Sequence, residues 1–197
     1  MSDLLRSNIS ARINITDEEW KAVLSVMKPR SLKKREVLLK AGEVCEYNSF
    51  IVKGCLRTFF TDEKGHDHIF QLGFEDWWSS DLMSFVTGEP ANYSIDALEE
   101  TEILQMHRDD YEKLLTEFPR FEKFFRLLMQ AAYVAAQKRM VESMSYSAEH
   151  RYLELVKKFS FMEMRVAQHH IASYLGITPE ALSRIKRGII EKSRTNS

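Results

Sequence analysis

The chain has 197 residues, of which 44% are hydrophobic and 29% are charged, and its formal net charge is −1. These values are typical of a globular protein with one large or two small domains. No apolar run approaches the roughly 18 residues of a membrane span, and Cys45 and Cys55 follow no secretory signal. We therefore expect a cytoplasmic protein with reduced thiols and no membrane partner.

The charges are unevenly distributed along the chain. Residues 138–197 contain 11 Lys and Arg against 6 Asp and Glu, whereas the rest contains 17 against 23. The two parts thus carry formal charges of +5 and −6. A basic end beside an acidic body favours nucleic-acid binding confined to the C-terminal part.

The first predicted element is a short helix over residues 16–27. Thr16 is a suitable N-cap and Glu19 stands three residues later, the spacing of a capping box. Pro29 ends this helix. One face of the helix is apolar and contains Trp20, Val23, Leu24 and Met27.

Short apolar runs separated by glycines and charged residues follow, as far as residue 106. Such runs are typical of strands joined by tight turns, and they predict a small antiparallel barrel or roll. The predicted strands are residues 37–39, 50–52, 56–60, 68–72 and 103–106.

A long helix is predicted next, because residues 119–144 contain no internal proline or glycine. At 1.5 Å per residue it would be about 40 Å long. Phenylalanines followed by small residues on one stripe favour pairing with a second copy of the chain. The alternative is that this stripe packs on its own barrel. The predicted dimer interface contains Phe121, Phe125, Leu128, Ala131, Ala132 and Ala135.

A hinge is predicted at residues 143–148, followed by a helix over residues 150–159 and then by the most informative segment, residues 169–186. Ile171, Ala172 and Leu175 share a helical face, and Gly176 is suited to end that helix in a left-handed conformation. Thr178 and Pro179 can begin a second helix. This pattern predicts a helix-turn-helix, although the same turn chemistry would also suit an ordinary helical hairpin.

The second helix of this motif carries the predicted DNA contacts. Arg184 can bond guanine O6 and N7 together, and Glu180 and Ser183 can reach neighbouring base edges. Thr178, Lys186 and Arg187 are predicted to contact phosphates. The full predicted interface is Gln168, His169, Thr178, Pro179, Glu180, Ser183, Arg184, Lys186 and Arg187.

The order roll, long helix and helix-turn-helix resembles the cAMP receptor protein and fumarate-nitrate regulator family of bacterial transcription factors. In the roll the resemblance rests on residues 39–43, 50–57 and 73–78. It implies an α+β fold divided into a sensor roll (1–116), a dimerisation helix (117–146) and a DNA-binding domain (147–197). It also implies a homodimer that binds a near-palindromic double-stranded operator, with RNA polymerase as a further partner.

Three departures from the family pattern qualify this implication. Members that bind cyclic AMP carry a Gly-Glu-Leu turn and an Arg-Ser/Thr-Ala triplet, where this chain has Ser80-Asp81-Leu82 and Ala91-Asn92-Tyr93. The N-terminal cysteine cluster of the oxygen sensors is missing. The β-hairpin wing after the second motif helix is predicted to be shortened or absent.

The effector is therefore unidentified, and we expect no response to cyclic AMP. The cassette arginine is replaced by Ala91, and residues 75–106 contain no Lys or Arg. A buried phosphate would then lack a compensating cation, unless Arg57 on a neighbouring strand supplied one. The candidate effector pocket contains Trp78, Ser80, Asp81, Leu82, Ala91, Asn92 and Tyr93.

Two alternatives to this regulator remain at the level of sequence. The first is a regulator that does respond to a cyclic nucleotide. The second is a cupin-like metal enzyme that uses His66 and His68, but Glu75 lies too far along the chain to complete its ligand set. The preferred interpretation is a regulator that is not an enzyme and that needs no cofactor or metal.

Overall fold

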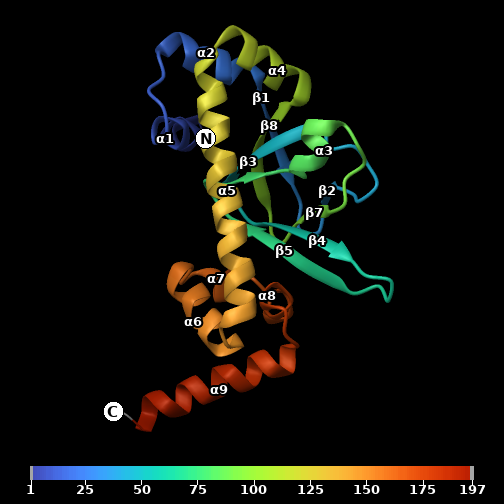
Figure 1. Ribbon diagram of the computed structural model, residues 1–197, viewed down its shortest axis with the longest axis vertical. Helices are drawn as coiled ribbons and strands as arrows, with labels where there is room; N and C mark the ends of the chain where they lie inside the picture. Colours follow the sequence, from blue (N-terminus) through green and yellow to red (C-terminus); the bar gives the residue numbers. More distant parts are fainter. Residues whose placement is uncertain (1, 196–197) are drawn as a thin grey trace. The chain divides into compact units, whose positions relative to one another are not determined.

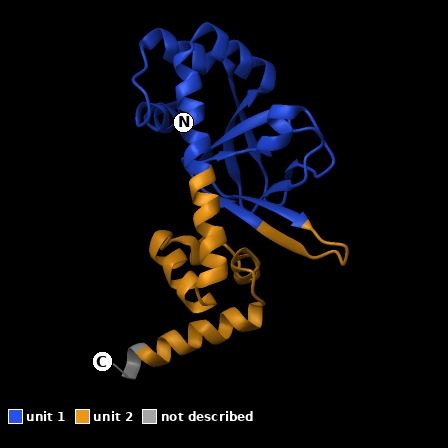
Figure 2. Ribbon diagram, in the orientation of Figure 1, with its two compact units in different colours: residues 1–60, 70–132 blue, residues 61–69, 133–197 orange. Residues whose placement is uncertain are grey.

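The structure is a computed structural model that describes residues 2–195, with side chains described as far as residue 192. The chain forms two compact units, one of residues 1–60 and 70–132 and one of residues 61–69 and 133–197 (Figure 2). The division falls inside a long helix. Helices and antiparallel strands are both present, so the α+β prediction is confirmed.

The first unit contains two four-stranded antiparallel sheets (Figure 1). One has the order β1 (Met27–Leu32), β8 (Thr101–His107), β3 (Tyr47–Lys53) and β6 (Trp78–Ser79). The other has the order β2 (Val37–Leu39), β7 (Ser94–Ala97), β4 (Leu56–Thr61) and β5 (Asp67–Gly73). Ile51 and Ile103 from the first sheet share a buried cluster with Leu39, Leu56 and Ile95 from the second. The predicted roll is thus confirmed.

Helices cover the other face of the first sheet. They are α1 (Ser2–Ser10), α2 (Asp17–Val26), α4 (Arg108–Glu117) and the first half of α5 (Arg120–Ser145) (Figure 1). Thr16 and Glu19 form the predicted capping box at α2. The short helix α3 (Leu82–Thr87) follows β6.

Two residues of the predicted dimer interface belong instead to the core of the first unit. Phe121 and Phe125 are only 1% and 4% exposed, and they pack in one cluster with Leu5 and Ile9 of α1. Their assignment to a dimer interface was wrong, because α1, which the sequence analysis did not predict, already covers them. The predicted alternative, packing within the chain, holds for this half of α5.

The second unit consists of the end of α5, the segment 61–69 and four further helices. These are α6 (Ala148–Lys158), α7 (Met162–Arg165), α8 (Gln168–Leu175) and α9 (Pro179–Thr195). No strand follows α8 within residues 2–195, and residues 196 and 197 lie outside the described part. Helix α9 thus occupies the residues after Arg187, where the sequence analysis expected the β-hairpin wing to be shortened or absent. None of the helices in the described part of the chain combines the length and apolar character needed to cross a bilayer.

Candidate nucleic-acid interface and sensor pocket

The turn between α8 and α9 has the local chemistry predicted for it. Gly176 ends α8 with φ 67° and ψ 34°, a left-handed conformation that costs glycine little. The N–H of Ile177 returns to the carbonyl of Ala172 at 3.0 Å. Thr178 Oγ1 accepts the N–H of Ala181 at 3.2 Å, so Thr178 caps α9.

The two helices meet on the predicted apolar faces. Ile171, Ala172, Leu175 and Leu182 are between 0% and 4% exposed, with Ala172 fully buried. The guanidinium of Arg151 on α6 donates to the carbonyl of Leu175 at 2.7 Å and so satisfies a free acceptor at the end of α8. A helix-turn-helix packed on a third helix is the result.

The outer face of α9 presents polar and basic groups to solvent. Glu180, Ser183, Arg184 and Arg187 are three or four residues apart and therefore share one face. Both arginines are exposed. The pKa of Glu180 is lowered, chiefly by a hydrogen bond from its own backbone N–H. The predicted contacts at the helix starts, Gln168, His169, Thr178 and Pro179, are also exposed.

Lys186 is placed differently from the other predicted contacts. Its ammonium forms an ion pair with Glu163 Oε1 at 2.6 Å, and the hydroxyl of Tyr152 donates to the same oxygen at 2.7 Å. The Lys186 bond is the main cause of the lowered pKa of Glu163. A phosphate contact by Lys186 would require this pair to break. Lys186 therefore anchors α9 to α7 in this structure.

The segment 61–69 contacts α8 through Ser173. The Ser173 hydroxyl accepts the N–H of Ile69 and donates to the carbonyl of Asp67, each at 3.0 Å. In the same segment, His68 Nε2 lies 2.9 Å from Asp62 Oδ2. No group of three potential metal-ligating residues occurs within the described part of the chain.

A buried carboxylate lies at the predicted effector pocket. Asp81 is 3% exposed and caps α3, accepting the N–H of Ser84 at 3.1 Å. Its other oxygen accepts the N–H groups of Asn92 at 3.0 Å and Tyr93 at 3.3 Å. The structure thus brings Asp81, Asn92 and Tyr93 together, and among residues 2–192 the donors to this carboxylate are backbone N–H groups.

The aromatic ring of Tyr93 stacks on Phe70, with centroids 5.1 Å apart and planes at 10°. Ala91, which the sequence analysis aligned with the cassette arginine, is 4% exposed and exchanges backbone hydrogen bonds with Gly42 and Glu43. No cationic side chain among residues 2–192 pairs with Asp81. This part of the roll is therefore occupied by the chain's own groups.

Three other predicted pocket residues do not join Asp81. Trp78 lies on the helix-covered face of the first sheet, where its Nε1 donates to Asn8 Oδ1 at 3.2 Å and its ring meets Phe124 and Phe125. Its assignment to the pocket was wrong, because alternation along β6 directs it away from the interior. Leu82 is 42% exposed, and Ser80 lines a separate cavity.

Arg57, the alternative cation, is already paired. It donates from Nε and Nη2 to the two oxygens of Asp96 at 2.7 and 2.8 Å, and the two side chains are only 13% and 10% exposed. Its guanidinium also lies over Phe59, 4.1 Å from the ring centroid. Recruiting Arg57 to a ligand would leave Asp96 buried without its partner.

The comparisons with known proteins agree with this architecture. Residues 29–118 match the sequence model of the cyclic nucleotide-binding domain family. FixK2 from Bradyrhizobium japonicum superimposes with a TM-score of 0.75 at 19% identity, over 85% of this chain and 86% of that chain. A CooA variant from Carboxydothermus hydrogenoformans gives 0.71 at 15% identity, over 92% and 88%. The Catabolite Activator Protein of Thermus thermophilus gives 0.54 at 21% identity, over 91% and 86%. No curated protein sequence matches the chain significantly.

The chain thus has a β-roll of the cyclic nucleotide-binding type, a long helix and a C-terminal helix-turn-helix, in this order. Residues 29–118 match the cyclic nucleotide-binding domain, and the fold of the chain is similar to those of FixK2 and CooA, in agreement with the resemblance predicted from the sequence.

Proposed function

We propose that this protein is a cytoplasmic DNA-binding transcription regulator that acts as a homodimer and does not respond to cyclic AMP. The observation that carries the proposal is the outer face of α9, where Arg184 and Arg187 are exposed on a helix that Gly176, Thr178 and the buried Ala172 hold in recognition geometry. A face of this kind fits the major groove, where arginine can bond guanine and phosphates.

Selection of random duplexes by the purified protein tests this proposal directly. We expect recovery of a near-palindromic sequence whose half-sites lie about one helical turn, or 34 Å, apart. Recovery of no sequence above the input frequency, at low salt and with folded protein, would contradict it.

Arg184→Ala is expected to weaken binding to the selected operator by about 1–3 kcal/mol and to relax preference at one base pair. The reason is the loss of a bidentate contact to a base edge. Fluorescence anisotropy with operator and random duplexes measures both effects. Arg187→Ala is the matched control, because loss of a phosphate contact should weaken the two duplexes alike and reduce the salt slope by about one. If Arg184→Ala weakened binding to the operator and to the random duplex equally, Arg184 would not be the residue that reads a base edge.

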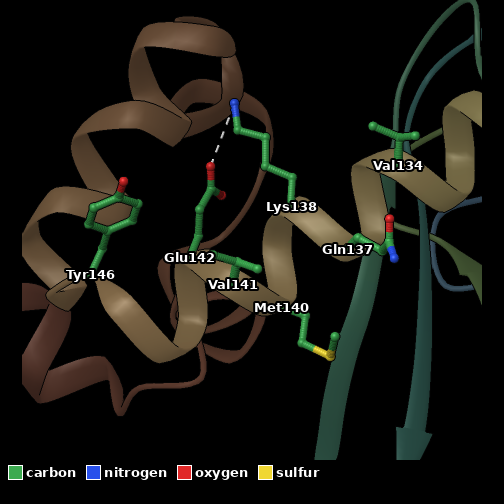
Figure 3. A pocket seen from close by; sticks show the side chains of 7 residues that line it. All are labelled: Val134, Gln137, Lys138, Met140, Val141, Glu142 and Tyr146. Atoms are coloured by element: carbon green, nitrogen blue, oxygen red, sulfur yellow. Dashed lines mark ion pairs between the residues drawn. The ribbon is translucent and has the colours of Figure 1, made fainter.

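The proposed dimer uses the second half of α5, where apolar side chains are exposed. Tyr133, Val134, Met140, Val141 and Met144 are between 55% and 79% exposed. Tyr133 and Met140, and likewise Val134 and Val141, are seven residues apart, which is the repeat of a two-helix seam. Figure 3 shows Val134 and Val141 among the side chains that line a pocket on this half of α5, together with Lys138 and Glu142, which form an ion pair at 3.7 Å. We therefore move the proposed seam from the predicted alanine stripe to this one.

Asp81 supports the absence of a cyclic AMP response. Its carboxylate takes up the N–H groups of Asn92 and Tyr93, which a ligand phosphate would need, and it would repel that phosphate. Arg57 is held by Asp96 and supplies no free cation. A phosphate entering here would displace a satisfied carboxylate and remain unpaired, which is unfavourable.

Calorimetric titration with cyclic AMP and cyclic GMP is expected to show no binding tighter than millimolar. The loss of one charge-assisted hydrogen bond alone is worth about 1.5–3 kcal/mol, and the buried Asp81 charge adds to it. A micromolar dissociation constant for either nucleotide would favour the alternative, a cyclic-nucleotide-responsive regulator.

A further inference from the structure

The interior of the roll contains a row of buried polar side chains that the proposed function does not use. Gln105, Ser49 and Ser79 are lateral neighbours on β8, β3 and β6, because Ser49 pairs with Gln105 on one side and with Ser79 on the other. They are 7%, 1% and 5% exposed. Ile51 and Ile103, two residues along the same strands, belong to the interior cluster, so the row faces the interior too.

The hydrogen-bonding capacity of this row is only partly used. Gln105 Nε2 donates to Ser49 Oγ at 3.3 Å. The side chains of Ser79 and Ser80 form no hydrogen bond with any described residue. Ser49 and Gln105 bond each other and the Ser79 hydroxyl bonds no described side chain or backbone group, so the row retains donors and acceptors that a bound molecule could use.

A cavity of about 200 Å³ opens beside the row. This volume corresponds to roughly seven water molecules at about 30 Å³ each, which suits a compact molecule and is too small for a nucleotide. The opposite wall is apolar and contains Leu39, Cys45 and Ile95. A ligand would therefore meet hydroxyl and amide groups on one side and hydrocarbon on the other.

The charges at the rim exclude anions. Glu43 and Glu46 line the cavity together with Arg30, whose guanidinium already lies 3.4 Å from Glu36. The carboxylates thus outnumber the available cation. No charged side chain belongs to the deep wall, so an ammonium group would lose its hydration there without a partner.

We infer that this cavity is a binding site for a small, neutral, hydroxyl-rich molecule of the size of a three- or four-carbon polyol. Its hydroxyl groups would pair with Ser79, Ser80 and the Gln105 amide, and its carbon chain would lie on Leu39 and Ile95. The site is separate from the Asp81 cassette position, although Ser80 adjoins both. That such a ligand acts as the effector of the regulator rests on the proposed function, whereas its binding does not.

The test is a titration of the full-length, isotope-labelled protein with glycerol and erythritol, followed through the amide NMR signals of Ser49, Ser79 and Gln105. We expect saturable shifts with a millimolar or lower dissociation constant. Glycerate, the matched anion, and ethanolamine, the matched cation, should bind at least about tenfold more weakly, since each such factor corresponds to about 1.4 kcal/mol. Non-saturable shifts in the wild type would show a cavity that holds water only and would overturn the inference.

Two variants test whether the ligand binds in this cavity. Ser79→Val replaces a hydroxyl by methyl groups and narrows the cavity, and Gln105→Leu removes the amide, so either should raise the dissociation constant at least about tenfold. Thr58→Val is the control, because Thr58 is a buried hydroxyl residue of the same roll, 5% exposed, that does not line the cavity. Unchanged affinity in both cavity variants would overturn the inference. Operator binding is measured in a separate experiment, so the polyol titration can be interpreted even if the protein does not bind DNA.

Discussion

Replacing both Val134 and Val141 with glutamate is expected to convert the protein to a monomer and to weaken operator binding at least about 100-fold. In the proposed seam each helix would place two carboxylates against apolar side chains of its partner, and an unpaired buried charge costs about 3–5 kcal/mol. A monomer binds one half-site and loses the 10²–10⁴-fold gain of divalent binding. Sedimentation velocity and operator titration measure the two effects.

The same double substitution on the alanine stripe of α5 is the matched control. At 3.6 residues per turn, Ala131 and Ala135 are centred about 90° around the helix axis from Val134 and Val141, and farther from Tyr133, Met140 and Met144. All four substituted residues are exposed within the chain, so neither pair of substitutions should unfold the protein. Ala131→Glu with Ala135→Glu is expected to leave the dimer intact. If the alanine-to-glutamate variant dissociates the dimer and the valine-to-glutamate variant does not, the dimer interface would be the alanine stripe predicted from the sequence.

The helix-turn-helix was predictable because its signals are local. Gly176, Thr178 and Pro179 act within one turn of their own positions, and the burial of Ile171, Ala172 and Leu182 follows from helical spacing. The partner of Lys186 was not predictable, because Glu163 lies on another helix and nothing in the spacing joins them. Helical spacing predicted that Lys186 faces solvent, but an ion pair with a residue of another helix holds its side chain against the protein.

Strand β1 and helix α1 escaped prediction for different reasons. Pro29 suggested an end to regular structure, but β1 is an edge strand, where a missing N–H is tolerated, and its pairing with β8 is non-local. In α1 only Leu5 and Ile9 are fully buried apolar residues, too few to give a clear period. Missing α1 led directly to the wrong assignment of Phe121 and Phe125.

The cassette position was located by resemblance, but its chemistry required the structure. The sequence showed that an arginine was absent and that acidic residues were near. It did not show that Asp81 itself accepts the N–H groups of Asn92 and Tyr93, because those bonds depend on how two loops meet. Likewise the polar row of Ser49, Ser79 and Gln105 emerges only from strand register.

Gly54→Ala is expected to destabilise the first unit by about 2–5 kcal/mol. Gly54 has φ 103°, and a left-handed conformation costs other residues about 1–2 kcal/mol. An added Cβ would lie 2.7 Å from Thr101 Cα and 2.8 Å from the Glu100 carbonyl oxygen, both backbone atoms that give way only if the strand moves. Such overpacking adds about 1–3 kcal/mol. Urea unfolding followed by tryptophan fluorescence measures this loss, since Trp20, Trp77 and Trp78 all belong to the first unit.

Gly42→Ala separates the two causes of this destabilisation. Gly42 lies in the same unit and has a similar φ of 91°, but nothing lies within 4 Å of the Cβ it would gain. The Gly42 variant should therefore be destabilised by the backbone strain alone, about 1–2 kcal/mol, and its roll should remain folded. Native domains are stable by only about 5–15 kcal/mol, so the Gly54 variant should lose a larger share of its unfolding free energy than the Gly42 variant. Equal losses in the two variants would mean that β8 yields at Thr101, and that the close approach of the Gly54 turn to this strand contributes little to the stability of the roll.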